Sequence, residues 1–148
     1  YLKYTLNITG HELDEILNKK SGLLGISGVS SDKRDVEEAA LHGNKRAQLA
    51  SDMLNYQIKK IVGSYIAAMG GVDVITFTAG LGENAIPLRE TICKAFEFMG
   101  LEFDSEANNC RGVEKIITKE GSKITACVIP TNEEIAICEE TVELVKGK

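Results

Sequence analysis

Hydrophobic positions recur with a helical period through most of the first half of this chain. The strongest pattern follows Gly43 and runs to Met69, with apolar residues at i, i+3 and i+4 on one side and polar residues on the others. This pattern predicts a long amphipathic helix that stops at Gly70, and its apolar stripe is typical of a core or a subunit interface. A shorter helix is expected after Ser31 or Asp32, either of which can serve as its N-cap.

Two features precede that shorter helix. Thr9 and Glu12 have the spacing of a capping box, so a helix is expected to begin there and to end by Gly22. Residues 21–31 interleave glycine and serine with large apolar side chains, which a flexible linker would not carry. We therefore expect an ordered loop over these residues, with at most one short strand.

The second half alternates strands with helices. The expected elements are, in order, a buried strand over residues 72–78, a helix over 86–99, strands over 113–117 and 124–129, and a helix over 133–145. Pro87 suits the first turn of its helix, Gly100 ends it, and Asn132 lies where a cap of the last helix is needed. The alternation favours an α/β layer structure in one domain over residues 1–148.

Composition and charge narrow the functional classes. The chain has 148 residues, 43% of them hydrophobic, and a net charge of -5, so we expect a globular domain with a real core. No basic tract favours nucleic acid as a partner, and the apolar runs are too short to span a membrane. The charged residues within positions 1–20 argue against a signal peptide.

The four cysteines lie far apart and form no C-x-x-C pair. Neither a zinc site nor a disulfide framework is expected, and reduced cytoplasm is the natural compartment. Cys93 and Cys138 fall on apolar helix faces, where a free thiol behaves as a small hydrophobic side chain.

The first candidate site lies where the strand over residues 72–78 ends. Ala79, Gly80 and Gly82 remove side-chain bulk between that strand and the next helix. A turn of this kind admits positive φ and lets another molecule approach its backbone, which is how phosphates and nucleotides are bound before a helix. A tight connection without a ligand explains the same residues, and they leave both interpretations open.

A second strand end also carries polar residues onto a helix. Residues 130–134 follow the strand over 124–129, and ligands of open α/β sheets bind beyond the carboxyl ends of strands, so both places can line one cleft. Glu133 and Glu134 stand in the first turn of the last helix. Acidic residues there commonly complement the helix dipole, but one of them can also hold Mg²⁺ together with substrate phosphates.

The start of the helix after residue 31 also has two interpretations. Asp32 is a suitable N-cap, and Asp35 is an acid matched to the helix dipole. The side chains of Asp32 and Arg34 can instead bind a ligand. From the residues alone, capping is the favoured interpretation.

A dinucleotide-binding fingerprint is the rival hypothesis for the glycine segment. Gly80 and Gly82 fit G-x-G-x-x-A after a strand, and Glu102 lies about where a ribose-binding acid is expected. Against this hypothesis, Glu83 would place an anionic side chain beside the pyrophosphate, and a long helix precedes the strand. An oxidoreductase module is therefore the less favoured class.

Four stretches together resemble the acetokinase family, of the actin, sugar-kinase and Hsp70-like ATPase superfamily. They are KKSGLLGISGVSSDKRD over residues 19–35, VITFTAGLGENA over 74–85, IPLRE over 86–90 and IPTNEEIAI over 129–137. The resemblance covers almost the whole chain. It implies the C-terminal part of an actin-like, ribonuclease H-like ATPase domain, in which helices flank a mixed sheet.

The resemblance also implies a function. Members of the family phosphorylate acetate with ATP to acetyl phosphate, reversibly and with Mg²⁺, in the cytoplasm and as homodimers. The implied contacts with the adenine nucleotide are made by Asp32, Lys33, Arg34, Gly80, Leu81, Gly82, Glu83 and Asn84. Glu133 is the implied Mg²⁺ ligand. For Asp32 and Arg34 the resemblance reverses the preference for a simple cap.

The resemblance places the family's catalytic residues upstream of this region, so no catalytic residue is assigned here. Phosphoryl transfer needs positioning and charge neutralisation from both sides of a cleft, and the 148-residue chain alone is not expected to turn over. A propionate or butyrate kinase is a close alternative, since the acyl pocket also lies outside these residues. A non-catalytic dimerisation module is a further alternative.

Overall fold

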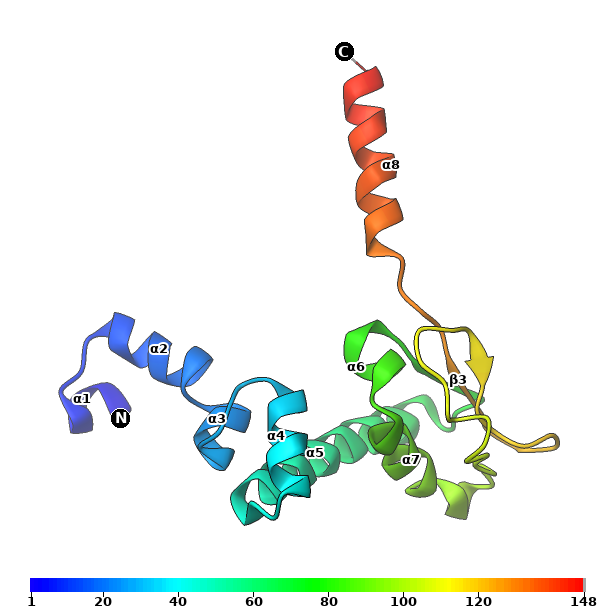
Figure 1. Ribbon diagram of the computed structural model, residues 1–148, viewed down its shortest axis with the longest axis horizontal. Helices are drawn as coiled ribbons and strands as arrows, with labels where there is room; N and C mark the ends of the chain where they lie inside the picture. Colours follow the sequence, from blue (N-terminus) through cyan, green and yellow to red (C-terminus); the bar gives the residue numbers. More distant parts are fainter. Residues whose placement is uncertain (148) are drawn as a thin grey trace. The chain divides into compact units, whose positions relative to one another are not determined.

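The computed structural model describes residues 1–147, and the chain divides into two compact units (Figure 1). The first unit is Tyr1–Val62, and the second begins at Gly63. The boundary falls inside the longest helix, α5 (Lys45–Met69), which matches the predicted amphipathic helix.

The first unit is entirely helical in its regular structure. Its elements are α1 (Leu2–Leu6), α2 (Gly10–Lys19), α3 (Gly22–Ser27), α4 (Lys33–Leu41) and the first part of α5. The capping box before α2 is confirmed, because Glu12 N donates to Thr9 Oγ1 at 3.2 Å and Thr9 N donates to Glu12 Oε2 at 2.7 Å. Asp32 is the N-cap of α4, as expected.

The prediction of a loop over residues 21–31 is wrong, because α3 occupies most of it. Arg46 in α5 donates from Nε to the Ile26 carbonyl at 2.8 Å and from Nη2 to the Gly25 carbonyl at 3.2 Å. These bonds satisfy carbonyls that a helix of six residues leaves open. The core of the unit lies beside them and consists of Val36, Ala47 and Ala50, with Leu23, Ile26, Ala39 and Ala40 packed against it.

The second unit contains a three-stranded mixed sheet with helices around it. Its further elements are β1 (Val74–Phe77), α6 (Ala79–Asn84), α7 (Ile86–Lys94), the 3-10 turn η1 (Glu97–Met99), β2 (Lys115–Ile116), β3 (Thr125–Val128) and α8 (Glu133–Lys146). The strand order is β1-β3-β2, with β1 parallel and β2 antiparallel to β3. The predicted mixed sheet flanked by helices is confirmed.

The core of this unit follows the alternation of its strands. Ile75 and Phe77 of β1 are buried, as are Ala126 and Val128 of β3, while the residues between them are more exposed. The other buried hydrophobic residues of the unit are Ile66, Leu88, Ile92, Cys93, Phe96, Leu101, Phe103, Ile117 and Ile124. They lie on α7, the end of α5, the sheet and the segments that connect them.

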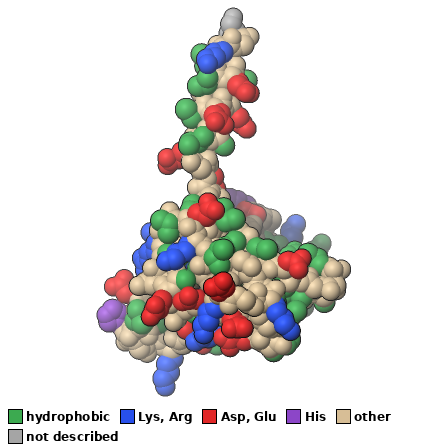
Figure 2. Space-filling view, turned by 90° about the vertical axis from the view of Figure 1, so that its right-hand side faces the viewer, with side chains coloured by type: hydrophobic (Ala, Val, Ile, Leu, Met, Phe, Trp, Pro, Cys, Tyr) green, Lys and Arg blue, Asp and Glu red, His purple; other side chains and the backbone are tan. Residues whose placement is uncertain are grey.

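Several elements differ from their sequence-based expectation. The helix expected over residues 86–99 ends at Lys94 and is followed by η1, and the strand expected over 113–117 is reduced to Lys115–Ile116. Residues 79–84 form a short helix, α6, rather than an irregular glycine turn. The last helix, α8, begins after Asn132 as predicted but buries none of its residues, so Cys138 is exposed rather than packed. Hydrophobic and acidic side chains both lie on its surface (Figure 2). No helix within residues 1–147 is long and apolar enough to cross a membrane.

Candidate functional site

The chain turns sharply from β1 into α6, and Gly82 makes that turn possible. Ala79 has a φ of 57°, in the left-handed region that residues with a side chain rarely adopt. A Cβ atom on Gly82 would lie 2.9 Å from the Phe77 carbonyl carbon, so only glycine fits there without a shift. Gly82 is buried and allows α6 to pack directly on the end of β1.

Gly80 is in a different environment, although it lies only two positions earlier. A Cβ atom built on Gly80 meets no atom within 4 Å, and the residue is exposed. Gly80 is thus the glycine of this segment that leaves room for another molecule. Leu81 is 39% exposed on the same short helix, and Asn84 braces the helix by donating from Nδ2 to the Gly80 carbonyl at 3.0 Å.

A cavity of about 410 Å³ opens beside Gly80 and is lined by Gly80, Thr131, Asn132, Glu133 and Glu134. Its position follows from the sheet, because β1 and β3 are parallel and their carboxyl ends lie side by side. Ile129 N donates to the Phe77 carbonyl at 2.9 Å just beyond the paired residues. The two strand ends identified in the sequence therefore meet at one cavity.

Glu83 connects α6 to the loop between β3 and α8, and both of these segments line the cavity. Its Oε1 accepts from Thr131 N at 2.8 Å and from Thr131 Oγ1 at 3.0 Å, across 48 positions of sequence. Sequence reasoning placed Glu83 in the glycine segment but gave no sign of this contact. A carboxylate that accepts two hydrogen bonds is a strong acceptor, so the connection is firm.

Arg89 in α7 is the residue that sequence reasoning missed. Its side chain is fully buried, and burial lowers the pKa of its guanidinium. Nη1 donates to the carbonyls of Gly82 at 2.8 Å and Glu83 at 2.7 Å, which are the carbonyls at the end of α6. The only signal in the sequence was an arginine placed between the buried positions Leu88 and Ile92 of an apolar helix face.

The guanidinium also fixes a loop beyond α7. Nε donates to Asn108 Oδ1 at 2.8 Å, and Nη2 donates to the carbonyls of Asn108 at 2.9 Å and Cys110 at 2.7 Å. Asn108 is itself buried and donates to the Ile86 carbonyl at 3.1 Å. Arg89 thus ties α6, the start of α7 and this loop together through neutral acceptors.

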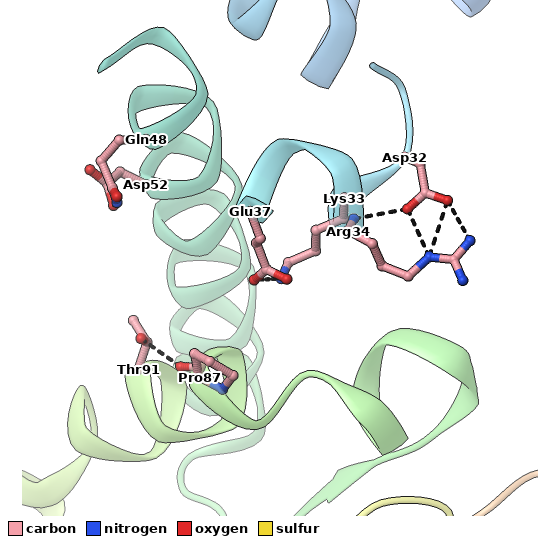
Figure 3. A network of polar contacts seen from close by, with 8 residues as sticks. All are labelled: Asp32, Lys33, Arg34, Glu37, Gln48, Asp52, Pro87 and Thr91. Atoms are coloured by element: carbon pink, nitrogen blue, oxygen red, sulfur yellow. Dashed lines mark hydrogen bonds and ion pairs between the residues drawn. The ribbon is translucent and has the colours of Figure 1, made fainter. Parts of the chain in front are cut away.

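The predicted residues Asp32, Lys33 and Arg34 begin α4 in the first unit (Figure 3). Asp32 Oδ1 accepts from Arg34 N at 2.8 Å, and its Oδ2 accepts from Arg34 Nη2 at 2.6 Å. The Arg34 side chain holds the pKa of Asp32 down to about 2. Lys33 pairs with Glu37 one turn further along and is mostly buried, whereas the Arg34 side chain is 88% exposed.

The acidic residues of the cavity can provide a single carboxylate ligand for Mg²⁺, but not a complete set of protein ligands. Within residues 1–147, no three His, Cys, Asp or Glu side chains gather into a group that could hold a metal ion by themselves. Glu133 and Glu134 are exposed at the cavity. Mg²⁺ commonly takes one or two protein carboxylates and fills its other positions with water and substrate phosphates, and a single glutamate fits that mode.

Comparison with known proteins identifies the family. The sequence pattern of the acetokinase family matches residues 1–139. The acetate kinase of Treponema denticola is 53% identical over 139 residues, which are 94% of this chain and 35% of that protein. The chain thus spans about a third of the length of the relatives it matches.

Solved structures agree with this result. A crystal structure of acetate kinase from Porphyromonas gingivalis is 50% identical, with a TM-score of 0.86, and the match covers 97% of this chain and 36% of that one. A propionate kinase from Francisella tularensis is 35% identical, with a TM-score of 0.78, over 90% of this chain and 34% of that one. The predicted actin-like fold is confirmed by these likenesses. The family match, rather than the dinucleotide fingerprint, accounts for the glycine segment, and the chain belongs to the acetokinase family.

Proposed function

We propose that this chain is the C-terminal nucleotide-binding portion of an ATP-dependent acetate kinase, which phosphorylates acetate to acetyl phosphate reversibly. The observation that carries the proposal is the cavity where β1 and β3 end, which is lined by both Gly80, with its open surroundings, and Glu133. The names of the relatives support acetate as the acceptor. The chain alone is expected not to turn over, because no catalytic residue is assigned to it.

The segment from Gly80 to Asn84 is proposed to face the adenosine of ATP or ADP, with backbone and small side chains against the nucleoside. Gly80 supports this role because its surroundings are open. The start of α4, with Asp32, Lys33 and Arg34, is proposed as a second contact with the nucleotide. There the exposed Arg34 guanidinium can meet an anionic or aromatic group, while its hydrogen bonds to Asp32 hold it in place.

Glu133 is proposed as the residue that holds Mg²⁺, directly or through water. When bound with the nucleotide, the ion would neutralise charge on the phosphate oxygens. Glu133 lies in the first turn of α8 and lines the cavity, so its carboxylate is available there. The neighbouring Glu134 lines the same cavity and is the natural comparison.

We also propose an alternative acceptor acid and an assembly state for the intact enzyme. Propionate or a longer acid is the alternative acceptor, which the likeness to a propionate kinase supports. A homodimer in the cytoplasm is proposed for the intact enzyme, without nucleic acid or membrane partners. The exposed hydrophobic residues of α8, which include Ile135, Ile137 and Leu144, favour a further protein surface over them.

The test is binding of ADP with Mg²⁺ to the 148-residue chain by calorimetry, with a Gly80→Val variant. The Cβ atom of the added side chain would lie in open space, with no atom within 4 Å, so the fold should survive. We expect affinity to fall at least about tenfold, since a ligand would lose close contact with the backbone.

Gly10→Val is the matched control, because Gly10 also has no atom near its Cβ position and lies at the start of α2. The affinity of the Gly10→Val variant for ADP with Mg²⁺ should equal that of the unaltered chain. Absence of binding by the folded, unaltered chain would contradict the proposal that these residues carry the nucleoside turn by themselves. Equal losses from both substitutions would contradict the role of Gly80.

A further inference from the structure

Within the proposed nucleotide site, Glu83 is the residue whose contacts are not explained by ligand binding. Its carboxylate is turned to the loop between β3 and α8, where Oε1 accepts both hydrogen bonds that Thr131 donates. A carboxylate facing the phosphates of a nucleotide would repel them. The Glu83 carboxylate instead serves as a hydrogen-bond acceptor for Thr131 within the protein.

The backbone of Glu83 is fixed independently of its side chain. Arg89 donates to the Glu83 carbonyl from the buried side of α6, at 2.7 Å. The same nitrogen holds the Gly82 carbonyl. Glu83 is therefore anchored in the core through its carbonyl while its carboxylate holds Thr131.

Thr131 lines the same cavity as Gly80. It lines the cavity together with Glu133, two positions along the chain. In the described part of the chain, α8 buries none of its residues, so its first turn has little packing of its own to hold it. The Glu83 contact is thus a direct constraint on where the loop and Glu133 lie.

We infer that Glu83 is a positioning residue, which holds the Thr131 loop so that Glu133 faces the Mg²⁺-nucleotide beside Gly80. This inference rests on the proposed function and adds to it a reason for an acidic side chain in the glycine segment. The carboxylate acts as a hydrogen-bond acceptor for Thr131, not as a charge on the ligand. A neutral acceptor of the same shape should therefore keep most of its effect.

The test compares Glu83→Ala with Glu83→Gln in the 148-residue chain. Glutamine keeps an oxygen that can accept from Thr131 and removes the charge, whereas alanine removes both. Amide hydrogen exchange at Thr131, followed by NMR without any ligand, reports the contact itself. We expect exchange about tenfold faster in Glu83→Ala and much less change in Glu83→Gln.

Affinity for ADP is then measured with and without Mg²⁺. Loss of two hydrogen bonds predicts an affinity for Mg²⁺-ADP about 5- to 30-fold weaker in Glu83→Ala, with most of the loss recovered in Glu83→Gln. Without Mg²⁺ the difference between Glu83→Ala and the unaltered chain should shrink, because Glu133 acts through the ion. If Glu83→Ala only disturbed the structure, the affinity for ADP would fall equally with and without Mg²⁺.

Two controls complete the set. Thr131→Val removes the hydroxyl donor but keeps the amide donor, so its loss should be smaller than that of Glu83→Ala. Glu90→Ala removes a partly exposed carboxylate of α7 that pairs with Lys94, and it tests for a general effect of charge. It should leave Thr131 exchange and nucleotide affinity unchanged.

The inference is overturned if Thr131 exchanges equally in Glu83→Ala and the unaltered chain. It is also overturned if Glu83→Gln loses as much affinity as Glu83→Ala while its Thr131 amide stays protected, because Glu83 would then act by charge. Failure of the proposed function looks different, since the unaltered chain would bind no Mg²⁺-ADP at all.

Discussion

At the scale of single residues, Gly80 and Gly82 belong to one motif, but the absence of a side chain has a different consequence at each position. Gly82 is needed by the protein itself, because a side chain there would press on the backbone of Phe77. Gly80 is not needed by the packing and leaves a surface open beside the cavity. The spacing of the glycines alone does not distinguish these tasks.

This difference predicts opposite outcomes for two alanine substitutions. Gly82→Ala should lower the free energy of unfolding by about 1–3 kcal/mol, because the new Cβ forces α6 away from β1. Gly80→Ala should change it by less than about 1 kcal/mol, since the Cβ meets open space and alanine favours the helix. Chemical denaturation of both variants measures the difference, and equal effects would show that Gly82 is not constrained by Phe77.

Arg89 is the residue on which the local structure around the cavity depends most. A buried guanidinium costs free energy unless its donors are satisfied, and here they are satisfied by backbone carbonyls and by Asn108. The carbonyls of Gly82 and Glu83, at the end of α6, gain a donor in return. Removal of Arg89 would take this donor from two buried acceptors at once, the Gly82 carbonyl and Asn108 Oδ1.

At the scale of elements, several helices begin at a side-chain cap, whereas α1, α3, α6 and α7 begin without one. Thr9 caps α2, Asp32 caps α4 and Asn132 caps α8 by accepting from Ile135 N at 3.3 Å. Asp32 differs from the other two because Arg34 binds its carboxylate as well. Its charge state is therefore coupled to the start of α4.

The coupling predicts how the start of α4 responds to acid. The pKa of Asp32 is lowered from 3.8 to about 2, chiefly by the hydrogen bond from the Arg34 side chain. A lowered pKa means that the ionised form stabilises the folded helix above about pH 4 and that this contribution is lost as pH falls toward 2. An NMR titration of the Asp32 carboxyl carbon measures this directly.

Arg34→Ala should return the pKa of Asp32 toward 3.8, because the main cause of the shift is removed. Asp32→Asn should keep the cap and abolish the acid response of α4, since asparagine caps helices but does not titrate. An Asp32 titration at its ordinary pKa in the unaltered chain would contradict the Asp32–Arg34 contact.

At the scale of the whole molecule, burial separates the cysteines into different classes. Cys93 is fully buried in α7, and burial raises the pKa of its thiol to about 12. Cys138 is exposed on α8. Because the thiolate is the reactive form, Cys93 can react only when the second unit opens.

We expect a thiol reagent at pH 8 to label Cys138 rapidly and Cys93 only at the rate of opening. Mass spectrometry of each cysteine follows the two rates. Arg89→Met should accelerate labelling of Cys93 at least about tenfold, because unpaired buried carbonyls lower the free energy of opening by about 1–3 kcal/mol each. Similar rates for Cys93 and Cys138 in the unaltered chain would contradict a closed core around α7.

Much of the fold and the location of the site could be predicted from the sequence, because the signals that carry them are local. Capping residues, glycines at helix ends and the alternation of apolar residues act on their own stretch of backbone. They predicted α2, α4, α5, β1 and the start of α8, and the glycine segment pointed to the cavity. The single domain that the sequence suggested stays a prediction, beside the two compact units.

Other features depend on residues that are distant in sequence, and only the tertiary structure decided them. The short helix α3 is held by Arg46, 20 positions after Ile26, which donates to its last carbonyls, and the local propensity of a six-residue stretch with two glycines does not favour a helix. The contact of Glu83 with Thr131 arises because parallel strands bring two strand ends together, and Arg89 is buried between α6 and the loop that contains Asn108. Patterns along a chain show which residues can form an element, but only the packing of distant elements determines which of them meet.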